Sequence, residues 1–527
     1  MFYFKHLVKY YFIIYVERYI NRSLFIIFIV IIYLKVFVKK KSNSYCLSYQ
    51  NNYKQSQHIN YQISRTNNIK AFECIPGLSS LPLIGSIGNP ENFYNLLSIL
   101  YEKFGNIVKL DGVFARASMV ILYEPEHFDQ VYRSEETLPS RPGFDTQIYY
   151  RTVLRKSTYD GVYGLTTAEG AQWRDFRTKV NPALLKPKLV KLYMPTLEKI
   201  AEDMVARLKS DPYLQQNFDL EMTKWSLESV GVIALGTRLG CLQDSISDEH
   251  PARILIKCAR DMLDLSYKLE NRPSLWRYLP TRNFKNLVKT FDKQWDTSLK
   301  FIEEAKKKIK EREHDVPEED KSVVEKLLAI DKKVAVAMAN EMLLAGIDTV
   351  AFTTTCLLYN LATNPHVQEK LREEIRSSEQ SNRYLRACLR ESLRLFAVIP
   401  ANLRRTTKEH IVAGYHIPKG IDVIAPNEFL SRMDKYYPRA KEFIPERWLV
   451  EKSDPLYYGN CHPMVTLPFG FGVRSCIGRR IAELEIEVLV KKLISNFNVS
   501  WDGPPAQVVT RVMNSIKKPY HFKFQSI

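Results

Sequence analysis

The pattern of apolar positions along the chain predicts a protein built mainly from helices. Four long segments carry apolar residues three and four positions apart, the spacing that lines one face of an α-helix; they are residues 189–208, 284–311, 332–362 and 480–497. Strand-like pieces are short and few, at 107–110, 119–122, 412–417 and 421–425. Gly414 and the Pro-Lys-Gly segment 418–420 predict the turns of a small hairpin. The expected fold class is therefore mainly α with a small β-sheet subdomain.

The chain divides by composition into three parts. Residues 24–34 form an uninterrupted apolar run of 11 residues, and basic residues follow it at Lys35 and 39–41. The run is shorter than the roughly 20 residues of a spanning helix, so residues 1–41 are interpreted as either a membrane anchor or a basic organelle presequence. Residues 42–74, rich in Asn, Ser, Gln and Tyr, indicate a polar linker. Residues 75–527 show no internal break and are expected to form one domain.

Composition supports a globular protein and narrows its partners. Of 527 residues, 45% are hydrophobic and 25% are charged, which excludes collagen-like and wholly disordered classes. The net charge is +18, and residues 1–72 contribute 11 basic residues against one acid. Because no nucleic-acid-binding motif accompanies this charge, a targeting segment or an acidic partner is favoured. The eight cysteines include no C-x-x-C pair, so free thiols are expected rather than a zinc site or redox dithiol.

The first stretch with chemical content is the glycine-rich loop 467–478, which contains Cys476. Glycines let backbone amides approach a cysteine sulfur, and Gly478 opens a predicted helix whose N-terminus favours a thiolate. Arg474 adds a positive charge that acts in the same direction. From these residues alone, Cys476 is either the ligand of one metal ion or a structural cysteine in a turn, which is the common case for a lone cysteine.

Two further stretches lie on predicted helices. Ala345 and Gly346 interrupt a long apolar helix, where the glycine costs about 1 kcal/mol but leaves room on one face. Asp348 and Thr349 follow and suit a proton relay; the alternative is a solvated carboxylate and a threonine bonded to its own helix. Elsewhere, the Glu391-Ser-Leu-Arg394 motif puts two charges on one helix face, which by itself indicates only an ordinary ion pair of about 0–1 kcal/mol.

Together these stretches resemble the cytochrome P450 family. The order is Ala-Gly-x-Asp-Thr, Glu-x-x-Arg, then Phe-Ile-Pro-Glu-Arg-Trp at 443–448, then Phe-x-x-Gly-x-Arg-x-Cys-x-Gly. The resemblance runs from about Ile75 to the C-terminus and makes 75–527 a catalytic domain. It implies a haem-thiolate monooxygenase that holds its haem between the long central helix and the helix after the cysteine loop.

The resemblance also implies residue roles. Cys476 would be the axial thiolate and metal ligand of haem b, and Phe469 would shield its sulfur. Asp348 and Thr349 would deliver protons to dioxygen, the co-substrate, and Ala345 and Gly346 would leave space for it. The haem propionates would meet Trp173, Arg177, Arg404 and Arg474. A structural charge cluster would join Glu391, Arg394 and Arg447.

Several details are similar to arthropod mitochondrial members of the family. A Gly-Arg-Arg-Ile-Ala-Glu run follows the cysteine, and two arginines lie four apart on one helix face. In that class such cations dock an acidic two-iron ferredoxin, which an NADPH-dependent reductase supplies with electrons. The docking residues implied here are Arg386, Arg390, Arg479 and Arg480. The implied location is the mitochondrial inner membrane, on its matrix side.

Two other interpretations stay open at this stage. One is a microsomal-type enzyme in the endoplasmic reticulum membrane, fed by an NADPH reductase. The other is a non-catalytic haem- or lipid-binding membrane protein. The implied substrate is small and lipophilic, either steroid- or sterol-like or a xenobiotic, because the segments expected around it are largely apolar. These are the loop before Trp173, 336–344, 398–403 and 508–515.

The chain departs from the family pattern at two places. Ala397 stands where the family usually has a proline after the Glu-x-x-Arg helix. Only residues 377–382 separate Arg376 from the next predicted helix, where the family normally has a longer stretch. This shortening is either genuine or a loss of sequence, and it puts the folding and partner docking of that side in question.

Overall fold

The computed structural model describes residues 69–78, 93–112, 117–135, 138–186, 188–243, 246–271, 274–312, 314, 316–377 and 381–527. The chain groups into two units, Met1–Cys74 and Ile75–Ile527. The predicted targeting or anchor segment 1–41 and most of the linker 42–74 lie outside the described residues. The elements that follow all belong to the second unit.

Helices make up most of this unit, as the periodicity predicted. They are α4 (Phe93–Phe104), α5 (Pro125–Ser134), α6 (Asp145–Tyr149), α7 (Lys156–Tyr159), α8 (Gly170–Leu184), α9 (Lys188–Ser210), α10 (Phe218–Leu235), α11 (Pro251–Ser266), α12 (Arg282–Lys310), α13 (Val323–Ile330), α14 (Lys332–Thr363), α15 (Pro365–Arg376), α16 (Arg383–Leu395), α17 (Asn427–Ser431) and α18 (Arg479–Asn496). The four segments predicted from apolar spacing correspond to α9, α12, α14 and α18. The fold class is confirmed as mainly α with a small sheet.

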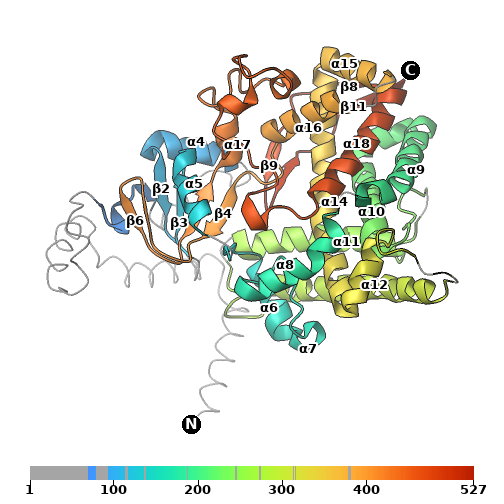
Figure 1. The fold of residues 1–527 in the computed structure, drawn as a ribbon, viewed down its shortest axis with the longest axis horizontal. Helices are drawn as coiled ribbons and strands as arrows, with labels where there is room; N and C mark the ends of the chain where they lie inside the picture. The colour runs from blue at the N-terminus through green and yellow to red at the C-terminus, as the bar shows by residue number, and fades with distance from the viewer. Residues whose placement is uncertain are drawn as a thin grey trace, which may run out of the picture. The chain divides into compact units, whose positions relative to one another are not determined.

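The longest helix, α14, runs through the centre of the helical half (Figure 1). It packs against α10, α12, α13, α16 and α18. Within the described part of the chain it is also the one helix long and apolar enough to cross a membrane, but most of its side chains are buried in the protein. That burial is typical of the core helix of a globular domain. Helix α14 is therefore a central part of the domain core.

The larger sheet lies on the other side of the domain, whereas β8 (Phe497–Trp501) and β11 (Phe522–Ser526) lie among the helices (Figure 1). A five-stranded sheet has the order β1 (Gly77–Leu78), β2 (Ile107–Leu110), β3 (Met119–Leu122), β7 (Asp422–Ala425) and β4 (Asn402–Arg405). The predicted hairpin is present as β5 (His410–Val412) and β6 (Tyr415–Ile417), which turn at Gly414 with φ +78°. Two more pairs join β8 to β11 and β9 (Val508–Thr510) to β10 (Asn514–Ile516).

The short connection after Arg376 is accommodated by one carboxylate. Glu374, near the end of α15, accepts hydrogen bonds from the backbone N–H groups of Tyr384 (2.7 Å) and Leu385 (3.0 Å) in the first turn of α16. A carboxylate at a helix N-terminus satisfies free backbone donors and complements the helix dipole. The two helices are thus tied together across the connection.

The thiol expectation holds for most of the described cysteines and is wrong for one. Cys241, Cys258, Cys356, Cys388, Cys461 and Cys476 are free, whereas Cys74 is disulfide-bonded.

Candidate functional site

The cysteine loop is a tight turn that delivers Cys476 to the start of α18. Backbone hydrogen bonds join Cys476 N to Phe469 O (2.9 Å) and Ser475 N to Gly472 O (3.0 Å). Gly470 and Gly472 have φ values of +74° and +67°, which glycine adopts without strain. The guanidinium of Arg479 lies 5.1 Å from the centroid of the Phe469 ring. The loop therefore has a single well-determined conformation around the sulfur.

Cys476 is an exposed residue, and its sulfur is surrounded by groups that favour a thiolate. Burial by the loop raises its pKa, while the backbone N–H of Gly478 and the guanidiniums of Arg177, Arg141 and Arg479 act in the opposite direction. These donors and charges would stabilise a negative sulfur bound to a metal ion. The donor set thus fits the thiolate ligand of a haem iron.

On α14, the predicted relay residues sit beside an exposed Ala345. The hydroxyl of Thr349 donates to the carbonyl oxygen of Ala345 at 2.6 Å, so the threonine does bond back to its own helix. Its oxygen lone pairs remain free to accept. Burial raises the pKa of Asp348, with Arg260 opposing the shift. The pair therefore combines a fixed hydroxyl with a carboxyl that holds its proton more firmly than usual.

Gly346 is packed closely against a neighbouring helix. A Cβ on this residue would come within 2.8 Å of Cγ2 of Val230 on α10. The hydroxyl of Ser226, also on α10, donates to the carbonyl oxygen of Gly346 (3.3 Å). The close approach of the two helices therefore requires a glycine here, and its expected role in leaving space for dioxygen stays a prediction.

Four arginines converge next to the cysteine loop. They are Arg177, Arg404 and Arg474, as predicted, and Arg141, which the sequence analysis missed. The Arg474 guanidinium stacks 3.9 Å from the centroid of the Trp173 ring and forms an ion pair with Glu169 (3.3 Å). Burial lowers the pKa of Arg474 to about 10, and repulsion by the other three arginines adds to the shift.

The charges of this arginine cluster are poorly compensated. Among the described residues, Glu169 is the one carboxylate that forms an ion pair with any of the four. Arg177 donates to Ser475 O (3.0 Å), but its buried Nε finds no partner in the described part of the chain. Buried cations and unsatisfied donors are costly unless an anion meets them. The two propionate carboxylates of a haem fit this surplus in both charge and hydrogen-bonding capacity.

The Glu391, Arg394 and Arg447 cluster forms as predicted, and all three side chains are 0% exposed. Glu391 receives Arg394 through two bonds (2.7 and 2.9 Å) and Arg447 at 2.8 Å. Its oxygens also accept from Trp448 Nε1 (2.9 Å) and Ile444 N (3.1 Å). The remaining Arg394 donors reach the carbonyl oxygens of Ser431, Ala440 and Glu442. Glu391, Arg394 and Arg447 therefore form a matched cluster in the sense that every side-chain nitrogen and both carboxylate oxygens are hydrogen-bonded within the protein, although two cations share one carboxylate.

The four predicted docking arginines line one hollow of about 520 Å³ beside the cysteine loop. All four are exposed. Arg386 pairs with Glu487 (2.8 Å) and Arg479 with Glu483 (2.9 Å), while Arg480 donates to Leu185 O. Arg390 lies 5.9 Å from the Trp448 ring centroid and has no carboxylate partner among the described residues. The hollow thus carries four positively charged side chains beside the cysteine loop.

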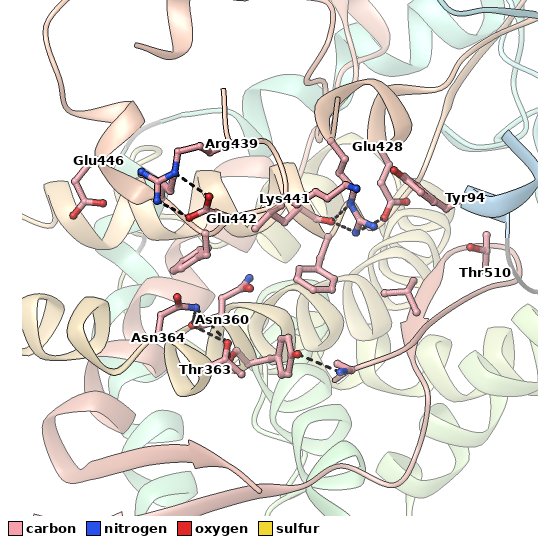
Figure 2. A pocket seen from close by; sticks show the side chains of 18 of the residues that line it. Tyr94, Asn360, Thr363, Asn364, Glu428, Arg439, Lys441, Glu442, Glu446 and Thr510 are labelled. Atoms are coloured by element: carbon pink, nitrogen blue, oxygen red, sulfur yellow. Dashed lines mark hydrogen bonds and ion pairs between the residues drawn. The ribbon is translucent and has the colours of Figure 1, made fainter. Parts of the chain in front are cut away.

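A second hollow, of about 830 Å³, lies between the ends of α14 and α16, α17 and the segment 439–446 (Figure 2). Two pairs of its charged lining residues bind each other, Arg439 with Glu442 and Arg432 with Glu428. Val508 and Thr510 of the predicted substrate segment 508–515 line it, but none of the predicted catalytic, haem-binding or docking residues does. It is therefore separate from the site around Cys476.

Comparison with known proteins agrees with this geometry. The sequence profile described as Cytochrome P450 matches residues 75–524, so the chain belongs to the cytochrome P450 family. It is accordingly a haem-thiolate monooxygenase, with haem b held by an axial cysteine thiolate and with dioxygen as co-substrate.

Similar proteins come from two flies. The probable mitochondrial cytochrome P450 12a5 of Drosophila melanogaster is 37% identical over 495 residues, which is 87% of this chain and 91% of the relative. Cytochrome P450 CYP12A2 of Musca domestica is 38% identical over 461 residues, 82% of this chain and 86% of the relative. The probable mitochondrial cytochrome P450 12b2 of Drosophila melanogaster is 36% identical over 460 residues, with 82% and 85% covered.

Proposed function

We propose that Cys476 supplies the axial thiolate and that the enzyme inserts one oxygen atom into a small lipophilic substrate with electrons from a two-iron ferredoxin. The observation that best supports this proposal is the cluster of four arginines beside the cysteine loop, which faces one ion-paired carboxylate among the described residues. The anionic propionates of a haem bound through that sulfur would supply the missing negative charge. A haem bound through a thiolate supplies the centre that activates dioxygen.

The chain's own residues hold that group and manage protons. Arg177, Arg404 and Arg474 would pair with the propionates, and Trp173, which stacks on Arg474, would hold that guanidinium in place. Thr349 keeps its hydroxyl on Ala345 O and so turns a lone pair toward the exposed side of α14. Asp348, whose pKa is raised by burial, returns a proton to this position after each turnover.

A lipophilic substrate fits the apolar surfaces that meet α14. Phe352 of α14 packs with Val398, the first residue of the predicted substrate segment 398–403, and with Ile516, which follows the predicted segment 508–515. Two of the predicted substrate segments therefore approach this helix. Such surfaces favour steroid- or sterol-like molecules or xenobiotics without selecting among them.

A ferredoxin donor and a mitochondrial location are supported together. Two of the similar proteins carry the word mitochondrial in their names. The exposed arginines beside the cysteine loop suit an acidic protein partner, because complementary charge steers association. We place the enzyme at the inner membrane on the matrix side; a microsomal enzyme would instead take electrons from an NADPH reductase.

The test is a carbon monoxide difference spectrum of the reduced wild type and Cys476→Ala, followed by reconstitution. A thiolate-type band that disappears in the variant supports the ligand. Substrate-dependent oxygen insertion with ferredoxin, its reductase and NADPH supports the donor. A band that persists in Cys476→Ala contradicts the ligand assignment, and turnover driven only by the microsomal reductase contradicts the donor and the location.

A further inference from the structure

A buried carboxylate on α14 binds a segment of chain far from it in sequence. Glu341 lies one helical turn before Ala345 and is only 4% exposed. Its two oxygens accept from Leu165 N (2.7 Å), Thr166 N (3.1 Å) and Thr166 Oγ1 (2.6 Å).

Arg151 completes this arrangement. Its side chain is 2% exposed, and Nη1 lies 2.6 Å from Glu341 Oε1 and 2.5 Å from Tyr163 O. The guanidinium also lies 5.3 Å from the centroid of the Tyr159 ring. A buried ion pair is stable only when its remaining donors and acceptors are also bonded. Here the backbone of the segment 163–166 provides partners for the Glu341 carboxylate and for Nη1 of Arg151, whereas the buried Nε of Arg151 has no partner among the described residues.

Gly164 allows the segment to wrap closely around the ion pair. Its φ is +82°, and a Cβ at this position would overlap the Glu341 carboxylate and the Arg151 guanidinium. A glycine is therefore needed both for the backbone conformation and for the space. The ion pair and the segment fit each other as one unit.

The same segment is held from its other side by the cysteine loop. Arg474 donates from Nη1 to Leu165 O (3.3 Å) and from Nη2 to Ala168 O (3.2 Å). The peptide groups of Leu165 thus bridge Glu341 on α14 and Arg474, two residues before Cys476. The segment 163–168 spans the distance between the two elements that carry the site.

We infer that Glu341 is a positioning residue that, with Arg151, fixes the segment 163–168 between α14 and Arg474 and so sets the wall of the substrate site. That this wall faces substrate rests on the proposed function; that Glu341 orders the segment does not. Glu341 touches none of the reacting atoms and acts through the backbone of Leu165 and Thr166.

The first test is hydrogen–deuterium exchange in the full-length holoenzyme carrying Glu341→Gln. The amide group of Gln keeps one acceptor and replaces the other by a donor, so Leu165 N–H or Thr166 N–H loses its partner. Exchange of a peptide covering 163–168 should accelerate about tenfold, the effect of losing one hydrogen bond to a charged group. Exchange at the wild-type rate would overturn the inference.

Glu228→Gln is the matched control. Glu228 is a fully buried carboxylate on α10 that likewise accepts from an arginine, Arg238 (2.5 Å), and from a backbone N–H, that of Cys241 (2.8 Å). Its loss should destabilise the fold in a similar way but leave exchange of the segment 163–168 unchanged. Equal acceleration in both variants would mean that Glu341 contributes only general stability, which also contradicts the inference.

A second readout probes the shape of the site with two iron-binding molecules, imidazole and the larger 4-phenylimidazole. Glu341→Gln should weaken the larger probe about fivefold or more while changing imidazole less than about twofold, because only the larger probe reaches the wall. Equal changes for both probes would contradict the role in site shape. Failure of the wild type to give a thiolate-type band counts against the proposed function alone, since amide exchange still reports on Glu341.

Discussion

Two groups of buried or half-buried arginines in this chain differ in how their positive charges are compensated. In the first, Arg394 and Arg447 surround Glu391, and every donor ends on a carboxylate or a carbonyl oxygen. In the second, Arg177 and three other arginines face one ion-paired carboxylate among the described residues. The first group needs nothing from outside the protein, whereas the second is completed only by an anion.

This difference separates a supporting role from a binding role. Where charges are matched internally, removing one leaves a buried partner without compensation and the fold loses stability. Where cations are in excess, burial and mutual repulsion lower the pKa values of Arg177 and Arg474. Removing one of those cations relieves repulsion and weakens only the hold on the ligand. The comparison therefore predicts opposite consequences for superficially similar substitutions.

The largest effect is expected at the matched cluster. Glu391→Gln should destabilise the domain by about 3–5 kcal/mol, because Arg394 and Arg447 would remain buried as uncompensated cations. We expect little or no haem-loaded protein, measured as haem per chain and as the thermal unfolding midpoint.

Glu442→Gln is the control for that substitution. It breaks an exposed pair with Arg439 that adds little to stability, because solvent screens both charges. Normal haem content and an unchanged midpoint in Glu391→Gln would show that the buried cluster is not what supports the fold.

An intermediate effect is expected at the surplus cluster. Arg177→Met should speed the transfer of haem to a scavenger protein about tenfold to a hundredfold, because one charge-assisted hydrogen bond to a propionate is lost. Stability of the haem-free protein in denaturant should be unchanged or higher. Arg174→Met, on the exposed face of the same helix, is the control and should leave haem retention alone. A fall in haem-free stability that accounts for the faster haem loss would place Arg177 with the supporting arginines instead.

Local sequence pattern was sufficient for one part of the site. The loop around Cys476 belongs to a motif with fixed spacing, whereas the Glu391 cluster was predicted only through the resemblance to the cytochrome P450 family, since Arg447 lies 56 positions from Glu391. The helices α9, α12, α14 and α18 could be predicted because apolar periodicity follows directly from burying one face or more. The cysteine loop and these helices depend on residues that are neighbours along the chain.

Features that depend on packing between distant segments could not be predicted. Arg141 joins the cluster because a β-bridge pairs Ser140 with Arg405, next to Arg404. The Arg151–Glu341 pair joins residues 190 positions apart. No sequence signal shows that α10 packs closely against Gly346. In each case the determining contact comes from tertiary structure.

The smallest effect is expected at the exposed docking arginines. There too an arginine without a carboxylate partner should bind an anionic partner better than a paired one, but solvent weakens the difference. Arg390 has no carboxylate partner in the described residues, whereas Arg479 is paired with Glu483. Arg390→Gln should raise the KM for ferredoxin about three- to fivefold, and Glu483→Gln should lower it about twofold by releasing Arg479 for the partner. Both effects should shrink as salt is added, because exposed charges are screened. Lys289 is an exposed cation on α12, and Lys289→Gln should leave both the KM for ferredoxin and its salt dependence unchanged. If Glu483→Gln raises the KM, the pairing seen within the chain does not limit docking, and the charge balance that distinguishes the buried clusters does not extend to this surface.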